Sequence, residues 1–176
     1  MKKFIRRLKI RFTDKKKYAQ MIGVKMGEHT SIASKDHWSS EPYLIEIGDY
    51  CRITKGVKFF THGAARLARR KYPNYDFFGK IKVGDWCFIG TNALIMPGVT
   101  IEDNVIVAAG SVVAKSVPKG SIVAGNPARI VGHIDDFIEK NLKYNMNTKG
   151  KSRAEKKKIL LSQDESMFVK KKFMTE

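Results

Sequence analysis

A repeat of six residues runs from Val83 to Pro118 and constrains the fold more than any other feature of the chain. Each unit opens with an aliphatic residue, and its fifth residue is small or apolar. A period of six fits neither an α-helix nor a hairpin meander, but it fits a prism-shaped parallel β-helix in which each hexapeptide forms one side. Three sides make one coil, so residues 18 apart should stack in an apolar column: Val83 on Ile101, Ile89 on Val107 and Ile95 on Val113.

The repeat is weaker before Val83. It begins near Met26 and Ile32, and regular units resume from Ile47. The spacing between these two isoleucines shifts the frame by three residues, which predicts a bulge or corner loop within residues 38–45. That loop would carry Trp38, Glu41 and Tyr43.

Residues 64–80 interrupt the repeat between Gly63 and Ile81 and should form a protruding loop. So long an excursion from a compact domain usually serves as a lid or a binding loop. The segment is rich in basic and aromatic residues, which favours a role in binding the substrate or a neighbouring subunit. The alternative is a solvated helical turn whose aromatic residues anchor it to the β-helix.

The net charge of +17 lies mostly at the two ends of the chain. Residues 1–17 hold nine Lys or Arg against one Asp, and residues 140–176 hold eleven against four acids. Because no basic face with interleaved aromatic residues lies on the repeat, we expect no nucleic-acid partner. Residues 2–12 have the pattern of a short amphipathic helix, which would either lie on an anionic membrane surface or pack on the β-helix.

The sequence predicts three parts: a basic, helical N-terminal extension over residues 1–20, a β-helix over 21–131 and a helical C-terminal extension over 132–176. Residues 14–20 look like a polar link, residues 134–147 like an amphipathic helix, and Ser152 to Glu155 like a capping box that opens another helix. No apolar run is long enough to span a membrane and no secretory signal is apparent, so we expect a cytoplasmic protein, peripheral at the inner membrane face if its N-terminus binds lipid. Cys51 and Cys87 should be small core residues.

Residues 26–132 resemble the hexapeptide-repeat acyltransferases, in particular the branch with the maltose, galactoside, xenobiotic and serine acetyltransferases. The segments 40–54, Phe-Phe-Thr-His-Gly ending at Gly63, and Ala-Gly-Asn-Pro-Ala-Arg ending at Arg129 are most similar to sugar O-acetyltransferases encoded with capsule and lipopolysaccharide genes. The resemblance implies an all-β, left-handed parallel β-helix. It also implies a homotrimer with active sites between subunits, acetyl-CoA as co-substrate and no required metal.

The same resemblance implies that His62, in its Thr-His-Gly segment, is the general base that takes the proton of the acceptor hydroxyl. An alcohol is a poor nucleophile until its proton is removed, and imidazole titrates near neutral pH. Asp36 or Glu41 could orient the ring, although some family members use a backbone carbonyl. The remaining histidines lack this context and are expected at the surface or in a cap: His29, His37 and His133.

By the resemblance, acetyl-CoA would contact residues from several repeats. Phe88 would lie along the pantetheine arm, Thr91 beside the cofactor, and the backbone amide of Ala109 would bind the arm. Lys115 matches a lysine of the family, although Ala114 replaces the threonine before it, and Arg129 would approach the nucleotide phosphates. The alternative for each is a turn residue that serves only the coil, most seriously for Thr91 and Ala109.

The leading prediction is an acetyl-CoA-dependent O-acetyltransferase that acts on a saccharide or glycan precursor. One alternative is N-acetylation of an amino sugar or a xenobiotic amine, which the same base could support. A γ-type carbonic anhydrase would share the fold, but it needs three histidines around a metal and only His62 is suitably placed. A non-catalytic β-helix scaffold would lack both the base and the contacts to CoA.

Overall fold

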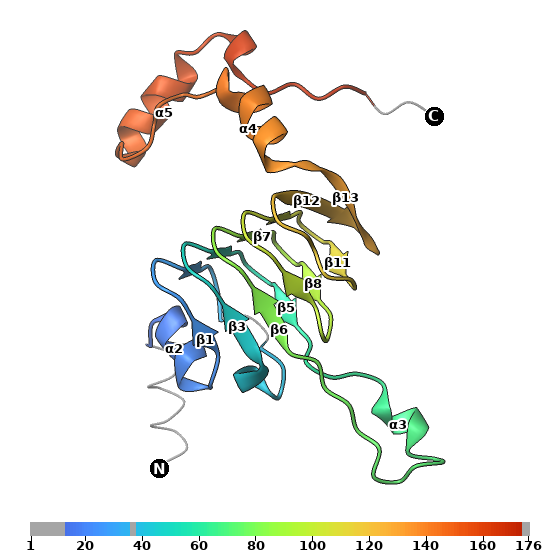
Figure 1. The fold of residues 1–176 in the computed structure, drawn as a ribbon. Helices are drawn as coiled ribbons and strands as arrows, with labels where there is room; N and C mark the ends of the chain where they lie inside the picture. Colours follow the sequence, from blue (N-terminus) through green and yellow to red (C-terminus); the bar gives the residue numbers. More distant parts are fainter. Residues whose placement is uncertain (1–12, 36–37, 174–176) are drawn as a thin grey trace. The chain divides into compact units, whose positions relative to one another are not determined.

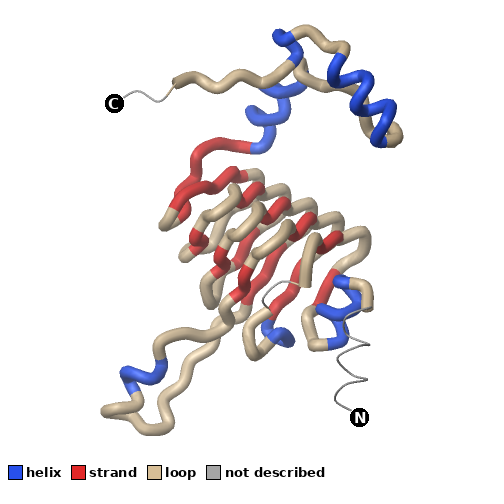
Figure 2. Tube along the Cα trace, turned by 180° about the vertical axis from the view of Figure 1, so that it is seen from behind, coloured by secondary structure: helices blue, strands red, loops and turns tan. Residues whose placement is uncertain are grey.

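The computed structural model describes residues 13–35 and 38–173, and in it three parallel sheets build a β-helix (Figures 1 and 2). Sheet A contains β1 (Lys25–Met26), β3 (Ile45–Ile47), β6 (Ile81–Val83) and β9 (Thr100–Ile101). Sheet B contains β2 (Ser31–Ile32), β4 (Arg52–Ile53), β7 (Phe88–Ile89), β10 (Ile106–Val107), β12 (Ser121–Gly125) and β13 (Ala128–His133). Sheet C contains β5 (Lys58–Phe59), β8 (Leu94–Ile95) and β11 (Val112–Val113). The chain visits the sheets in the order A, B, C, as a triangular coil requires.

The strand register confirms the predicted apolar column. Val83 pairs with Ile101, Ile89 with Val107 and Ile95 with Val113. All six side chains are buried, and so are Cys51 and Cys87, as their places in the repeat predicted. Each coil therefore covers the aliphatic residues of the next, and burial of a Val or Ile side chain is worth about 1.5–3 kcal/mol.

The two ends of the repeat differ from the prediction. Residues predicted as a polar link form α2 (Lys15–Met21), because the Asp14 carboxylate caps the helix by accepting a hydrogen bond from the Lys17 amide at 3.1 Å, and Ala19 is buried in the core. At the other end the pattern does not stop at Pro118, since β12 adds a further parallel strand to β10. The shortened last coil brings Val123 beside Val107, and β13 then pairs antiparallel with β12.

Residues 64–80 protrude between β5 and β6, as predicted, and carry α3 (Ala65–Ala68) (Figure 1). The base of this loop is closed by an antiparallel bridge between His62 and Phe78 and by a hydrogen bond from the Gly79 amide to the Thr61 carbonyl at 2.7 Å. A side chain on Gly79 would overlap the backbone of Gly98, so the chain returns to the β-helix there only with glycine. The tyrosines and phenylalanines of the loop stay 40–56% exposed and do not anchor it to the core.

The described chain divides after Ile134 into two compact units. The second contains most of α4 (Ile134–Leu142), α5 (Arg153–Leu161) and the 3₁₀ turn η2 (Glu165–Met167). The predicted capping box is present, because the Ser152 hydroxyl accepts from the Glu155 amide and the Glu155 carboxylate accepts from the Ser152 amide. The first predicted helix ends at Leu142, earlier than expected.

No helix in the described ranges has both the length and the apolar character needed to cross a bilayer. The amphipathic pattern over residues 2–12 lies outside the described residues.

Candidate active site

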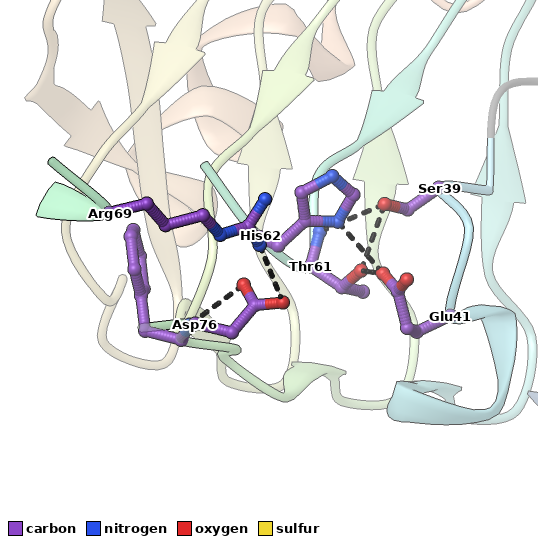
Figure 3. Close-up of polar contacts among 7 residues, drawn as sticks. Ser39, Glu41, Thr61, His62, Arg69 and Asp76 are labelled. Carbon is purple, nitrogen blue, oxygen red and sulfur yellow. Dashed lines mark hydrogen bonds and ion pairs between the residues drawn. The ribbon is translucent and has the colours of Figure 1, made fainter. Parts of the chain in front are cut away.

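The candidate base lies where the coil is interrupted, at the corner that leaves sheet C after β5. The His62 side chain is 41% exposed, whereas Glu41, which faces it, is only 16% exposed. His62 Nδ1 lies 2.8 Å from Glu41 Oε2, and the same oxygen accepts a hydrogen bond from the Thr61 hydroxyl at 2.6 Å (Figure 3). The hydroxyls of Ser39 and Thr61 are 2.8 Å apart and extend this network.

These contacts define which ring nitrogen is free. An ionised carboxylate can only accept hydrogen bonds, so Nδ1 of a neutral His62 carries the proton and Nε2 keeps its lone pair. In the described part of the chain Nε2 has no hydrogen-bond partner. The hydrogen bond from Thr61 and, to a smaller degree, the one from His62 hold the pKa of Glu41 below its ordinary value. Glu41 therefore stays ionised at neutral pH and orients the ring.

Trp38 packs the corner loop that carries Glu41 against the core. Trp38 stacks on Phe59 with ring centroids 5.0 Å apart and planes 5° apart, and both side chains are buried. Glu41 then precedes the 3₁₀ turn η1 (Pro42–Leu44), which leads into β3. The loop formed at the shift of the repeat frame thus brings a carboxylate of the preceding coil to His62. The other predicted candidate, Asp36, lies outside the described residues.

A pocket of about 470 Å³ opens beside this network and is lined by the base of the protruding loop. Arg69 braces the loop, because its Nε donates to the Tyr75 carbonyl at 2.9 Å and its Nη2 to Asp76 Oδ2 at 3.1 Å. The ring of Phe78 meets the His62 ring edge to face, with centroids 6.0 Å apart. The lining residues are Ser40, Glu41, His62, Gly63, Ala64, Ala65, Arg66, Arg69, Asp76 and Phe78.

The residues predicted to contact CoA lie in other parts of the β-helix. Phe88 is 41% exposed on the outer face of β7. Thr91 and Ala109 stack at the corner that leaves sheet B, where the Gly110 amide donates to the Thr91 carbonyl. Lys115 and Arg129 line a separate pocket of about 380 Å³ formed with β11, β12 and β13. The structure thus brings Thr91 close to Ala109, and Lys115 close to Arg129. None of these residues lines the pocket beside His62 in the same chain.

Sequence reasoning missed Ser39, and it named Arg66 only as one of several basic residues in the loop of residues 64–80. Ser39 reaches Thr61 only because the corner loop turns at a positive φ of 62°, which the sequence pattern does not reveal. Thr61 belongs to the predicted Thr-His-Gly segment, but its burial and its contacts with Glu41 and Ser39 are visible only in the structure. Among the described residues no group of three or more His, Cys, Asp or Glu side chains is arranged to hold a metal ion.

Comparisons with known proteins show which family the chain is similar to. Residues 80–115 match a family model described as the hexapeptide repeat of succinyl-transferase. Protein CapG of Staphylococcus aureus is 43% identical over 144 residues, which cover 80% of this chain and 84% of CapG. "Putative acetyltransferase YvoF" of Bacillus subtilis is 51% identical over 127 residues, covering 70% of this chain and 68% of that protein. Galactoside O-acetyltransferase of Escherichia coli is 35% identical, covering 54% of this chain and 47% of that enzyme.

A solved structure extends the comparison to the fold. The hexapeptide-repeat acetyltransferase of Vibrio cholerae, in complex with acetyl coenzyme A, superimposes with a TM-score of 0.58 at 25% identity. The match covers 72% of this chain and 82% of that chain. It confirms the predicted left-handed β-helix.

Proposed function

Because the chain belongs to the hexapeptide-repeat acetyltransferase family, we propose that it transfers the acetyl group of acetyl-CoA to a hydroxyl of a saccharide or glycan precursor, with His62 as general base. The observation that carries the proposal is an imidazole held by Glu41 at Nδ1, with Nε2 unbonded among the described residues, at the edge of a pocket. The galactoside O-acetyltransferase relative and the acetyl-CoA complex of the Vibrio protein support the acceptor class and the donor.

The reaction needs one proton acceptor and no covalent enzyme intermediate. His62 Nε2 takes the proton of the acceptor hydroxyl while its oxygen attacks the thioester carbonyl carbon. The tetrahedral intermediate then collapses, the carbon–sulfur bond breaks, and the CoA thiolate leaves with the proton from the imidazolium. Glu41 stabilises the imidazolium that forms in between, since its carboxylate accepts the Nδ1 hydrogen bond at 2.8 Å.

An acceptor screen tests the proposal. Purified protein with acetyl-CoA is offered saccharide hydroxyls and amino-sugar or xenobiotic amines, and release of the CoA thiol is followed together with the mass of the product. We expect O-acetylated saccharides. Products acetylated only on nitrogen would establish the amine alternative instead. If the CoA thiol is released no faster with any acceptor than by hydrolysis of acetyl-CoA without acceptor, acetyl transfer to both classes is contradicted.

Replacing Glu41 with Gln should lower kcat by at least about tenfold, and by less than the roughly 10⁴-fold that the corresponding Asp→Asn change causes in a Ser-His-Asp triad. Gln keeps the shape of the side chain but loses the charge that orients the ring and stabilises the imidazolium. Steady-state kinetics at pH 7.5 measure the change. An unchanged kcat would remove Glu41 from the mechanism.

The stability that Glu41 contributes to the folded protein should depend on pH. The pKa of Glu41 is lowered in the folded protein, so its stabilisation is fully present above the ordinary carboxyl pKa of about 4.3 and is lost as the pH falls through the lowered value. The difference in Tm between the native protein and Glu41→Gln should therefore be largest at neutral pH and shrink in acid. A difference that grows in acid would contradict this direction.

We further propose a homotrimer whose subunits complete the active sites. Outward side chains of sheet A are polar, as at Lys82 and Thr100, whereas β7, β8, β10, β11 and β12 point apolar side chains outward from sheets B and C: Phe88, Leu94, Ile106, Val112 and Ile122. Because the CoA residues flank sheets B and C, association through these faces would place the CoA residues of one subunit near His62 of another.

Replacing Val112 with Asp should therefore break the trimer. A charge introduced on an apolar interface has no partner and must be desolvated on association. Sedimentation velocity should show a 20.0 kDa monomer for this variant, with acetyl transfer at least about tenfold slower because donor and acceptor no longer meet. Thr100→Asp, on the outer face of sheet A, is the matched control and should stay trimeric. A monomeric native protein with full activity would contradict the proposal.

A further inference from the structure

Among the residues that the structure describes, one cation that lines the pocket beside His62 has no carboxylate partner. Two carboxylates line the pocket, and each is already engaged: Glu41 with His62 and Thr61, and Asp76 with Arg69. Arg66 lines the same pocket. Over residues 13–35 and 38–173 it makes no ion pair or hydrogen bond through its side chain.

Arg66 is an exposed residue that lines the pocket together with Arg69. Arg66 lies within α3 and Arg69 is its C-cap residue, so the two are three residues apart, a spacing that puts both side chains on one side of a helix. Arg69 is used to brace the loop through Tyr75 and Asp76, so its guanidinium is partly satisfied. Arg66 has no such task within the described chain. The next two cations, Arg70 and Lys71, do not line the pocket.

The whole loop of residues 64–80 carries a net positive charge. Residues 64–80 contain five Lys or Arg and a single acid, Asp76. The pocket lining itself holds two arginines and two carboxylates, so the excess belongs to the loop around it, and this excess raises the local concentration of anionic ligands near the pocket. A neutral sugar would leave the guanidinium of Arg66 without a partner when it covers the pocket, whereas a carboxylate or phosphate would bind it through two parallel hydrogen bonds.

From this charge balance we propose that the acceptor is a saccharide bearing an anionic group, and that Arg66 binds this group while a hydroxyl of the same molecule lies at His62 Nε2. The inference rests on the proposed function and names its substrate class. The anionic group is a carboxylate, as in a uronic acid, or a phosphate, as in a sugar phosphate. Arg66 is therefore a residue that determines specificity, and Arg69 positions the loop that carries it.

Binding is measured first, because it does not depend on turnover. The His62 ring is observed by NMR in the CoA-bound protein while methyl glucoside, glucuronic acid or glucose 6-phosphate is added. We expect saturable shifts with one or both acidic sugars at concentrations about tenfold lower than with the neutral sugar. A tenfold gain in affinity is at the lower end of what a hydrogen bond between charged groups contributes. Arg66→Ala should abolish this difference, and Arg70→Ala, which changes the same charge outside the pocket, should keep it.

Turnover gives the second readout. The ratio of kcat/KM for acidic over neutral acceptors should fall about tenfold in Arg66→Ala and recover in part in Arg66→Lys, which keeps the charge. If the neutral sugar binds as tightly as both acids, or if Arg66→Ala and Arg70→Ala act alike, the inference is overturned while acetyl transfer by His62 still stands. The carboxylate and phosphate arms tell which anion is preferred.

Discussion

Replacing His62 with Ala should lower kcat for acetyl transfer by about 10²–10⁴-fold, the contribution of a positioned general base. The loss is expected in kcat because the ring acts only when the acceptor proton is removed. The predicted CoA residues lie elsewhere on the β-helix, so acetyl-CoA should bind to the variant with native affinity, measured by calorimetry. The His62 side chain is 41% exposed and Glu41 keeps its hydrogen bond from Thr61, so removal of the ring should lower the Tm only slightly.

The control is His133→Ala, which removes an exposed imidazole at the end of β13. This variant should transfer acetyl groups at the native rate. A His62→Ala protein that turns over as fast as the native protein would exclude the ring as the base. A variant that loses binding of acetyl-CoA together with turnover would instead place His62 in the donor site.

Replacing Phe59 with Ala should lower the free energy of unfolding by about 3–5 kcal/mol, the usual cost of deleting a large aromatic side chain from a core. Phe59 is fully buried and stacks on Trp38, so the change leaves a cavity and removes the aromatic pair. Urea denaturation followed by circular dichroism measures the difference. Phe59→Leu is the matched control and should cost much less, because it keeps most of the apolar volume.

Phe59→Ala should also affect the active site. Trp38 holds the corner loop from which Glu41 meets His62, and His62 follows Phe59 by three residues. Below the unfolding transition, Phe59→Ala should therefore also reduce kcat, while Phe59→Leu keeps it near the native value. A stable Phe59→Ala protein with native unfolding energy would contradict the burial and the stacking described above.

The period of six predicted the regular part of the fold because it constrains each residue by a residue of the next coil. The pairing of Ile89 with Val107 follows directly from it. The pairing of residues 18 apart fails where a coil has another length. Val123 pairs with Val107 after a coil that is two residues shorter, and β12 was therefore missed. It also says nothing about capping of an adjacent helix, which made α2 appear as a polar link.

The candidate site was predictable only in part. Glu41 was, with Asp36, a candidate partner of His62 because it belongs to the preceding coil, and the two side chains do meet at 2.8 Å. Ser39 and Arg66 depend on the path of loops that the repeat does not describe. The roles of Phe88, Thr91, Ala109, Lys115 and Arg129 at the donor remain predictions, since in the proposed trimer they would depend on contacts of acetyl-CoA with more than one subunit.

The most direct test is a rapid-quench measurement of a single turnover, with enzyme in excess over acetyl-CoA at a saturating concentration of acceptor, in the native protein and in His62→Ala. Such an experiment isolates the chemical step from binding and product release. Our account predicts that the variant rate at pH 7.5 is about 10²–10⁴-fold lower than the native rate. Equal single-turnover rates in the two proteins would contradict it.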